Sequence, residues 1–164
     1  MKNKKIQQIT RAALIAALYV ALTHLSNLFG LASGAVQLRL SEALCVLPFF
    51  MPSAIPGLFI GCIIANLTTR AVFLDVVFGS LATLIGAYLA SKLKNKYLVP
   101  LPTVLANTVI VPFVVLFCYT SREAWGIGTY LITVLGVFAG EIISAYVLGI
   151  ILLSALDKRK NIFK

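Results

Sequence analysis

The stretch VQLRLSEALCVLPFF, residues 36–50, places a glutamine, an arginine, a serine and a glutamate around the start of an apolar run. Proline removes a backbone donor and clashes inside a helix, so Pro48 and Pro52 predict that a helix beginning near residues 40–41 is short. The polar cluster stands out because 60% of the 164 residues are hydrophobic and only 12% are charged. The stretch therefore predicts a short apolar helix with polar side chains at its start.

The composition of the whole chain predicts an all-α integral membrane protein. Its mean hydropathy is +1.00, and its charged fraction is well below the roughly one quarter that is usual in soluble domains. Apolar segments near the roughly 20 residues that a helix needs to cross a bilayer recur along the sequence. The expected helices cover residues 9–29, a short segment from 40–41, 54–69, 72–91, 102–119 and 127–156. We therefore expect one membrane domain over residues 1–164, a six-transmembrane-helix bundle whose second helix is too short to span upright.

Lysine and arginine residues are distributed unevenly between the two ends of the expected helices. Eleven would lie at the end that holds both termini, and three, Arg39, Arg70 and Arg122, at the other end. Positively charged segments stay on the cytoplasmic side, so this asymmetry predicts a multi-pass protein with both termini cytoplasmic. The net charge of +9 does not indicate a nucleic-acid partner, because the basic residues flank membrane segments instead of forming one surface.

Small residues recur at four-residue spacing, which lets two helices approach closely in a membrane. The positions are Ala13, Ala17 and Ala21 in the first helix, with Ala12 and Ala16 beside them, Gly57 and Gly61 in the third, and Gly136 and Gly140 in the last. The glycine pairs predict packing within the bundle. For the alanine stripe, defined as Ala13, Ala17 and Ala21, internal packing and docking of a partner protein are both open.

Three of the five acidic residues lie in or at membrane helices. Glu123 and Asp157 fall in segments expected to be solvated, whereas Glu42, Asp75 and Glu141 do not. A charge inside a bilayer costs roughly 2.5 to 3.5 kcal/mol even on insertion scales, so each should face a cavity, a partner or water. We expect one pocket, open to the outer side, with these polar lining residues: Gln37, Arg39, Glu42, Asn66, Asp75, Asn107 and Glu141.

Structural pairing is the alternative for some of these residues. Arg39 is close in sequence to Glu42, and Arg70 is close to Asp75, so either pair could be an ion pair without a ligand. Glu141 has no cation nearby in the sequence, which makes it the strongest candidate for ligand contact. His24 is alone on the first helix and is more typical of a packed histidine than of a ligand-binding one.

The residue types of the expected pocket indicate the kind of ligand. Three carboxyl groups and three amides with few arginines favour a ligand rich in N–H donors, neutral or cationic, because carboxylates and amide oxygens are acceptors. One carboxylate can accept two parallel N–H bonds. Trp125 and Tyr130 could stack on a planar ring, as aromatic side chains do on bases.

Three long segments carry a resemblance to a known family. The sequences QLRLSEALCVLPFFMPSAIPGLFIGCIIANL, LDVVFGSLATLIGAYLASKLKNKYLVPLPTVLANTVIV and GEIISAYVLGIILLSAL, in this order, resemble the queuosine-precursor transporter (QueT) family. Its members are substrate-binding S components of energy-coupling factor (ECF) transporters in the bacterial plasma membrane. The resemblance implies a six-helix bundle with a long loop between the first two helices that covers an outward-facing pocket. Gln37, Arg39 and Glu42 would then belong to the cover and rim of this pocket.

The resemblance also implies a ligand and partners. The ligand would be a 7-deazaguanine such as 7-aminomethyl-7-deazaguanine, 7-cyano-7-deazaguanine or queuine. The partners would be a transmembrane T component, docked on Ala13, Ala17 and Ala21, and two cytoplasmic ATPases. The chain itself has no GxxxxGK[ST] phosphate-binding loop, so ATP would be used by the partners, and we expect no cofactor of its own.

Other function classes are less well supported by the residues. No nucleophile and base pair is recognisable, and Cys45, Cys62 and Cys118 are isolated, so neither an enzyme nor a metal site is expected. The main alternative is a stand-alone secondary transporter of a nucleobase-like or vitamin-like solute, with Glu141 as its protonation site. A further alternative is an intramembrane enzyme or a purely structural bundle. Neither rival explains the alanine stripe as well as docking of a partner does.

Overall fold

The computed structural model describes residues 2–31 and 37–158, and this part of the chain contains helices but no strand. The elements are α1 (Lys2–Leu28), a 3₁₀ helix η1 (Leu40–Phe49), α2 (Ala54–Thr68), α3 (Phe73–Ala90), α4 (Leu101–Tyr119), α5 (Ile127–Glu141), a π-helical segment η4 (Ile142–Val147) and α6 (Leu148–Asp157), with one-turn 3₁₀ helices η2 (Lys96–Leu98) and η3 (Arg122–Ala124). The predicted all-α fold is confirmed. The predicted loop residues 32–36 lie outside the described part.

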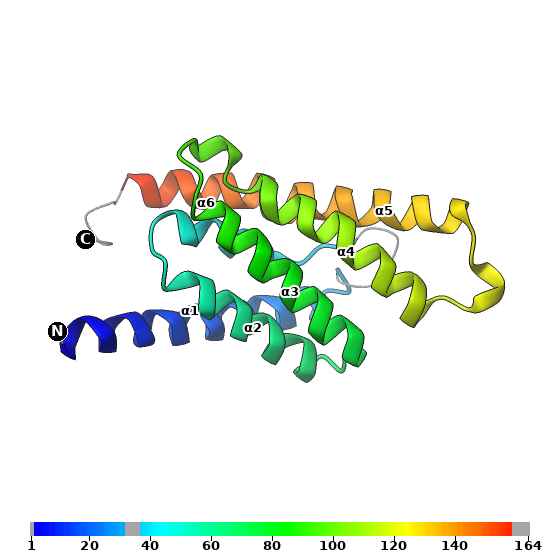
Figure 1. The fold of residues 1–164 in the computed structure, drawn as a ribbon, viewed down its shortest axis with the longest axis horizontal. Helices are drawn as coiled ribbons and strands as arrows, with labels where there is room; N and C mark the ends of the chain where they lie inside the picture. Colours follow the sequence, from blue (N-terminus) through cyan, green and yellow to red (C-terminus); the bar gives the residue numbers. More distant parts are fainter. Residues whose placement is uncertain (1, 32–36, 159–164) are drawn as a thin grey trace.

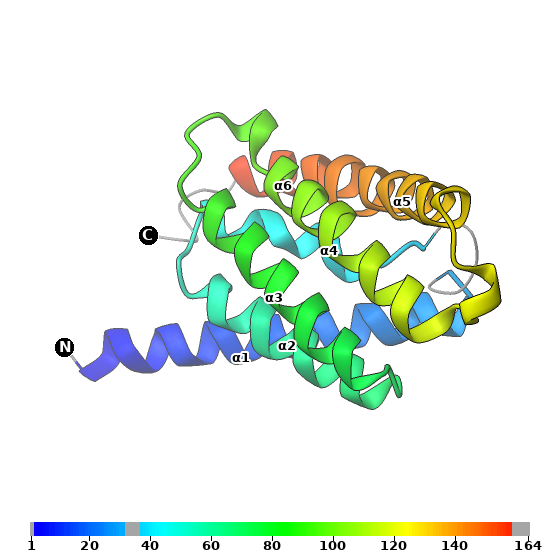
Figure 2. The same cartoon turned by 45° about the vertical axis from the view of Figure 1, so that its right-hand side comes forward.

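The last three elements form one long helix. Figures 1 and 2 show α5 and α6 in line, and the helical stretch Ile127–Asp157 is 31 residues long. This agrees with the single helix predicted over 127–156. The six-residue π-helical segment η4 within it was not predicted, because hydropathy does not report the hydrogen-bond pattern of a helix.

Four helical stretches in the described part are long and apolar enough to cross a membrane: Asn3–Leu28, Phe73–Ala90, Lys96–Tyr119 and Ile127–Asp157. The protein is therefore a multi-pass membrane protein. The apolar helices Leu40–Phe49 and Ala54–Thr68 are shorter. At 1.5 Å per residue the 15 residues of α2 extend about 22 Å, less than the roughly 30 Å of a hydrocarbon core. Six complete crossings remain a prediction.

The short helix η1 lies inside the bundle. Seven of its ten residues are buried, and Pro48 lies within it. Leu44, Cys45 and Leu47 join the hydrophobic core with residues of α1, α2 and α3. Because η1 is surrounded by the other helices, its length does not have to match the bilayer, which explains how a proline-limited helix fits this fold.

Glycines bring α2 against α1, as the small-residue spacing predicted. A β-carbon added to Gly57 would lie 2.6 Å from the carbonyl oxygen of Ala12, and one added to Gly61 would lie 3.0 Å from the Cα of Ala16. The alanine stripe lies elsewhere on α1: Ala13, Ala17 and Ala21 are all exposed. The contact with α2 therefore leaves the stripe uncovered.

The two ends of the bundle differ in charge. Figure 1 shows the start of α1 and the end of α6 at the same end, with the α3–α4 connection. Lys96 Nζ lies 3.6 Å from Asp157 Oδ2 there, which joins that connection to α6. Lysines at the start of α1 and in the α3–α4 connection, with Lys158 after α6, thus share one end, while Arg39, Arg70 and Arg122 belong to the segments at the other.

Candidate functional site

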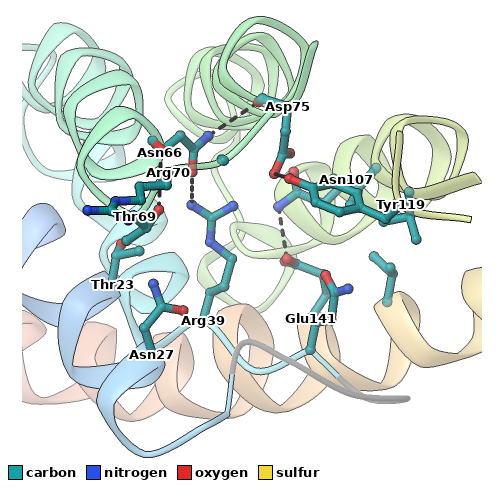
Figure 3. Close-up of a pocket in the computed structure, with 15 residues that line it drawn as sticks. Thr23, Asn27, Arg39, Asn66, Thr69, Arg70, Asp75, Asn107, Tyr119 and Glu141 are labelled. Carbon is teal, nitrogen blue, oxygen red and sulfur yellow. Dashed lines mark hydrogen bonds between the residues drawn. The ribbon is translucent and has the colours of Figure 1, made fainter. Parts of the chain in front are cut away.

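A cavity of about 360 Å³ lies at the end of the bundle that carries these arginines. Figure 3 shows its polar side chains converging from α1, α2, α3, α4 and α5 and from the segment before η1. The lining residues are Thr23, Asn27, Gln37, Arg39, Asn66, Thr69, Arg70, Ala71, Asp75, Asn107, Val111, Val115, Tyr119, Val137 and Glu141. Six of the residues predicted from the sequence are therefore brought together: Gln37, Arg39, Asn66, Asp75, Asn107 and Glu141.

Glu141 and Asn107 form a buried polar pair in the cavity lining. Asn107 Nδ2 donates to Glu141 Oε1 at 2.9 Å, and both side chains are buried (Figure 3). Glu141 Oε2 is also buried but has no hydrogen-bond partner in the described part of the chain. An unsatisfied buried polar atom costs about 1 to 3 kcal/mol, so it calls for an explanation such as a ligand.

The backbone around Glu141 is unusual for a membrane helix. Glu141 ends α5, and the π-helical segment η4 begins at Ile142. Single turns of π-helix occur frequently at functional sites, because the extra residue changes the direction of the side chains around it. The helix is thus irregular next to the unsatisfied carboxyl group.

Arg39 and Asn66 form a second polar pair. Arg39 Nη2 donates to Asn66 Oδ1 at 2.8 Å, and Asn66 Nδ2 donates to the carbonyl oxygen of Asp75 at 3.3 Å. Arg39 therefore does not pair with Glu42, and Arg70 makes no ion pair with Asp75 among the described residues. Neither of the ion pairs considered from the sequence accounts for these charges.

Tyr119 closes the side of the cavity formed by α3 and α4. Its hydroxyl donates to Asp75 Oδ2 at 3.3 Å and accepts from the backbone N–H of Val72 at 3.1 Å. Tyr119 was not predicted from the sequence, and neither were Thr23, Asn27 and Thr69. A usable signal was present: each is a polar residue in or near the last turn of a helix that ends at the arginine-bearing end.

The segment before η1 lies against α5 at Gly140, the neighbour of Glu141 in the chain. A β-carbon added to Gly140 would collide with the backbone carbonyl oxygen of Gln37. Glycine at 140 therefore allows the segment before η1 to run against α5 next to residue 141. The predicted packing role of this glycine is confirmed, since Gly136 and Gly140 are both buried.

Glu42 lies outside the cavity lining. It is 1% exposed, accepts a hydrogen bond from the hydroxyl of Tyr19 at Oε1, and contacts Cys45 Sγ through Oε2 at 3.2 Å. Both of its oxygens therefore have partners within the protein. The adjacent Ser41 is held similarly, since Thr23 Oγ1 donates to its hydroxyl at 2.9 Å.

The two predicted stacking residues also lie away from the cavity lining. Trp125 packs edge-on against Phe117 with ring centroids 4.8 Å apart, and Tyr130 lies 5.1 Å from Phe113. Trp125 is at the turn before α5, where its side chain covers the end of α4. His24 is exposed and lies 2.9 Å from Thr68 Oγ1, so it is hydrogen-bonded between α1 and α2 instead of buried.

The chemistry available at this cavity is recognition. Carboxyl and amide oxygens, amide N–H groups and two guanidinium groups surround it, with valines on one side. Within residues 2–31 and 37–158, no three His, Cys, Asp or Glu side chains gather closely enough to hold a metal ion. The arrangement fits a small polar ligand with both donors and acceptors.

Comparisons with known proteins agree with the sequence-based resemblance. Residues 9–158 match the profile of the family described as QueT transporter. The queuosine precursor transporter QueT of Lactococcus lactis subsp. cremoris (strain MG1363) is 37% identical over 101 residues, which cover 59% of this chain and 59% of that relative. The matched part thus spans less than two thirds of the relative's length. No solved structure matches the chain.

Proposed function

Because this chain belongs to the QueT transporter family, a family of transporters and not of enzymes, we propose that it is the substrate-binding membrane subunit of an ECF-type importer for queuosine precursors. The ligand is a 7-deazaguanine such as 7-cyano-7-deazaguanine, 7-aminomethyl-7-deazaguanine or queuine. The observation that carries this proposal is the unpartnered oxygen of Glu141 at the cavity, beside its bond to Asn107.

The chemistry of a guanine-type edge fits this carboxyl group. Its ring N–H and adjacent amino group are two parallel donors, which one carboxylate can accept together. Asn107 holds one oxygen of Glu141 in place, and Asp75 and Asn66 offer further acceptors along the same cavity. A cavity of about 360 Å³ is within the range usual for small-molecule sites. Glu42, with both oxygens occupied inside the protein, is no longer assigned a direct contact.

The proposed orientation places the cavity on the outer side. Charge asymmetry supports it, because the lysine-rich end of the bundle holds the start of α1 and the end of α6, and the cavity lies at the opposite end. The segment entering η1 then acts as the cover of the site. Its support is the contact of Gln37 with Gly140, directly beside Glu141.

The proposed partners are a transmembrane T component and two cytoplasmic ATPases. The alanine stripe supports a docked helix, because Ala13, Ala17 and Ala21 are exposed while the neighbouring Ala16 packs against Gly61. Small side chains allow the close approach that helix association in lipid requires. The stripe therefore suits the T component better than packing within this chain.

A binding experiment tests the ligand. Calorimetry on the purified chain should give saturable binding of 7-cyano- or 7-aminomethyl-7-deazaguanine, and adenine should not compete. Absence of binding to every 7-deazaguanine would contradict the proposal. Mass spectrometry of ligand released from freshly purified protein provides an independent reading.

A substitution in the stripe tests the partners. Ala17→Trp should hold the two backbones apart and abolish uptake by cells that express the complete transporter, while the purified chain still binds ligand. Ile9→Trp, at another exposed position of α1, is the matched control and should retain uptake. Loss of ligand binding in Ala17→Trp would show instead that the stripe is needed for the fold of this chain.

A stand-alone secondary transporter is the second candidate. The buried carboxyl group of Glu141 favours it, because acidic residues inside membrane domains also serve as protonation sites. The two candidates differ in energy source. Uptake by proteoliposomes that contain this chain alone and a proton gradient would support the secondary transporter, and uptake only with the ATPases would support the importer.

A further inference from the structure

Arg70 has an unfavourable backbone conformation for its residue type. Its φ of 60° is the one positive φ among non-glycine residues in the described ranges 2–31 and 37–158. It lies just after the end of α2. There the N–H of Arg70 donates to the carbonyl oxygen of Leu67, and the N–H of Ala71 donates to the carbonyl oxygen of Asn66. This helix-ending pattern normally uses glycine at the left-handed position. A side chain kept where glycine fits better points to a function of that side chain.

The Arg70 side chain lines the proposed ligand cavity. Figure 3 shows it beside Thr69 on the side formed by α2. Because Arg70 is exposed, its side chain lies toward the mouth of the cavity. Its guanidinium group makes no hydrogen bond or ion pair with the described residues. Arg39, in contrast, donates to Asn66 at 2.8 Å. Arg70 is thus the cavity arginine with all its N–H donors available to a ligand.

The charged side chains that line the cavity itself are equal in number for the two signs. Among the described residues that line it, the acids are Asp75 and Glu141 and the bases are Arg39 and Arg70. A ligand without net charge leaves this balance intact, whereas a ligand whose cationic group lies against the α2 side of the cavity brings a positive charge to Arg70. Electrostatic mismatch of this kind lowers the affinity for the wrong ligand more than it raises the affinity for the right one.

We propose that Arg70 is a specificity-determining residue of the site: it donates to an acceptor group of the bound heterocycle, a carbonyl or nitrile, and disfavours ligands that carry a positive charge. This inference rests on the proposed function, because it assumes that a 7-deazaguanine occupies the cavity. Arg70 would then discriminate between ligands with a neutral 7-cyano substituent and ligands with a cationic 7-aminomethyl substituent.

The test measures stability and affinity in the same variant. Arg70→Gly removes the strained side chain, so the ligand-free protein should melt about 2 to 4 °C higher. Its dissociation constant for 7-cyano-7-deazaguanine should rise roughly 10- to 100-fold, as expected for loss of a charge-assisted hydrogen bond. The dissociation constant for the 7-aminomethyl compound should stay the same or fall. Opposite signs for stability and binding are not expected of a residue that only ends a helix.

Two further variants separate charge from shape. Arg70→Lys keeps the charge and should keep the order of the two ligands, whereas Arg70→Asn, a residue that tolerates the left-handed conformation, should behave like glycine. Three results for Arg70→Gly would each overturn the inference. They are equal changes in the dissociation constants of the two ligands, a change below threefold in the dissociation constant for 7-cyano-7-deazaguanine, and a lower melting temperature. If the wild-type protein binds neither ligand, the proposed function fails instead, so the two failures are distinguishable.

Discussion

Glu42 and Glu141 are two glutamates that look alike in the sequence and have different environments in the structure. Glu42 is 1% exposed and Glu141 is 6% exposed, so burial does not separate them. Their partners do. Glu42 bonds to Tyr19 and Cys45 through its two oxygens, whereas Glu141 bonds to Asn107 through one and leaves the other unpaired.

This difference distinguishes a structural acid from a binding acid. A buried carboxyl group whose oxygens are both occupied fixes the elements that it joins, here η1 and α1. A carboxyl group with an unsatisfied oxygen at a cavity lowers the stability of the ligand-free protein but can accept a hydrogen bond from a ligand. Such a loss of stability is usual at functional sites. Substitutions at the two glutamates, at Gly140 and at Glu123 test the distinction.

Glu141→Gln should produce the largest loss of ligand affinity. It keeps the shape but replaces an acceptor by a donor, and disrupting a buried charge-assisted pair costs roughly 2 to 5 kcal/mol. This corresponds to a dissociation constant raised about 30-fold to several thousand-fold, measured by calorimetry with a 7-deazaguanine. The amide oxygen of the glutamine can keep the hydrogen bond from Asn107, so the ligand-free variant should melt close to the wild type. Near-native affinity would remove Glu141 from the site.

Glu42→Ala should chiefly reduce stability. The Tyr19 hydroxyl would lose its acceptor inside the protein, at about 1 to 3 kcal/mol, and a cavity would add to this cost. A thermal melt in detergent should therefore shift downward by several degrees. The isosteric Glu42→Gln, compared directly with Glu141→Gln, should change the ligand dissociation constant by less than about threefold. A large loss of affinity in Glu42→Gln would remove the contrast between the two acids.

Gly140→Ala should weaken binding moderately. The added methyl group would push the backbone at Gln37 away from α5, and overpacking costs from about 1 kcal/mol upward. We expect the lower end, an increase of about fivefold in the dissociation constant, because the segment can move outward. Gly128→Ala is a suitable control, since a β-carbon there meets no atom within 4 Å. Equal behaviour of the two variants would show that Gln37 does not cover the site.

Glu123→Gln should have the smallest effect. Glu123 is exposed in the turn before α5 and lies outside the cavity lining, so neither melting temperature nor affinity should change measurably. Calorimetry and a thermal melt beside Glu141→Gln give the comparison. A strong effect at Glu123 would mean that the cavity extends to the η3 turn in the ligand-bound protein.

Agreement between sequence and structure is best where a feature depends on local composition. Hydropathy located the long apolar helices, and Pro48 and Pro52 correctly predicted a short second helix. The family profile and the apolar helices confirm a multi-pass membrane transporter. Polar residues inside apolar segments are costly, so their presence alone was enough to select Asp75, Asn107 and Glu141 as cavity residues.

Only the tertiary structure decided what each polar group contacts. The sequence could not separate Glu42 from Glu141, place Trp125 and Tyr130 away from the cavity, or find Tyr119 and Arg70 at its edge. It also could not show that Ala13, Ala17 and Ala21 stay uncovered while Ala12 and Ala16 pack against α2. The physical reason is that uniformly apolar helices carry no periodic pattern that reports rotation or register. The partner of a side chain is set by how neighbouring helices rotate and cross, and only the packed bundle determines that.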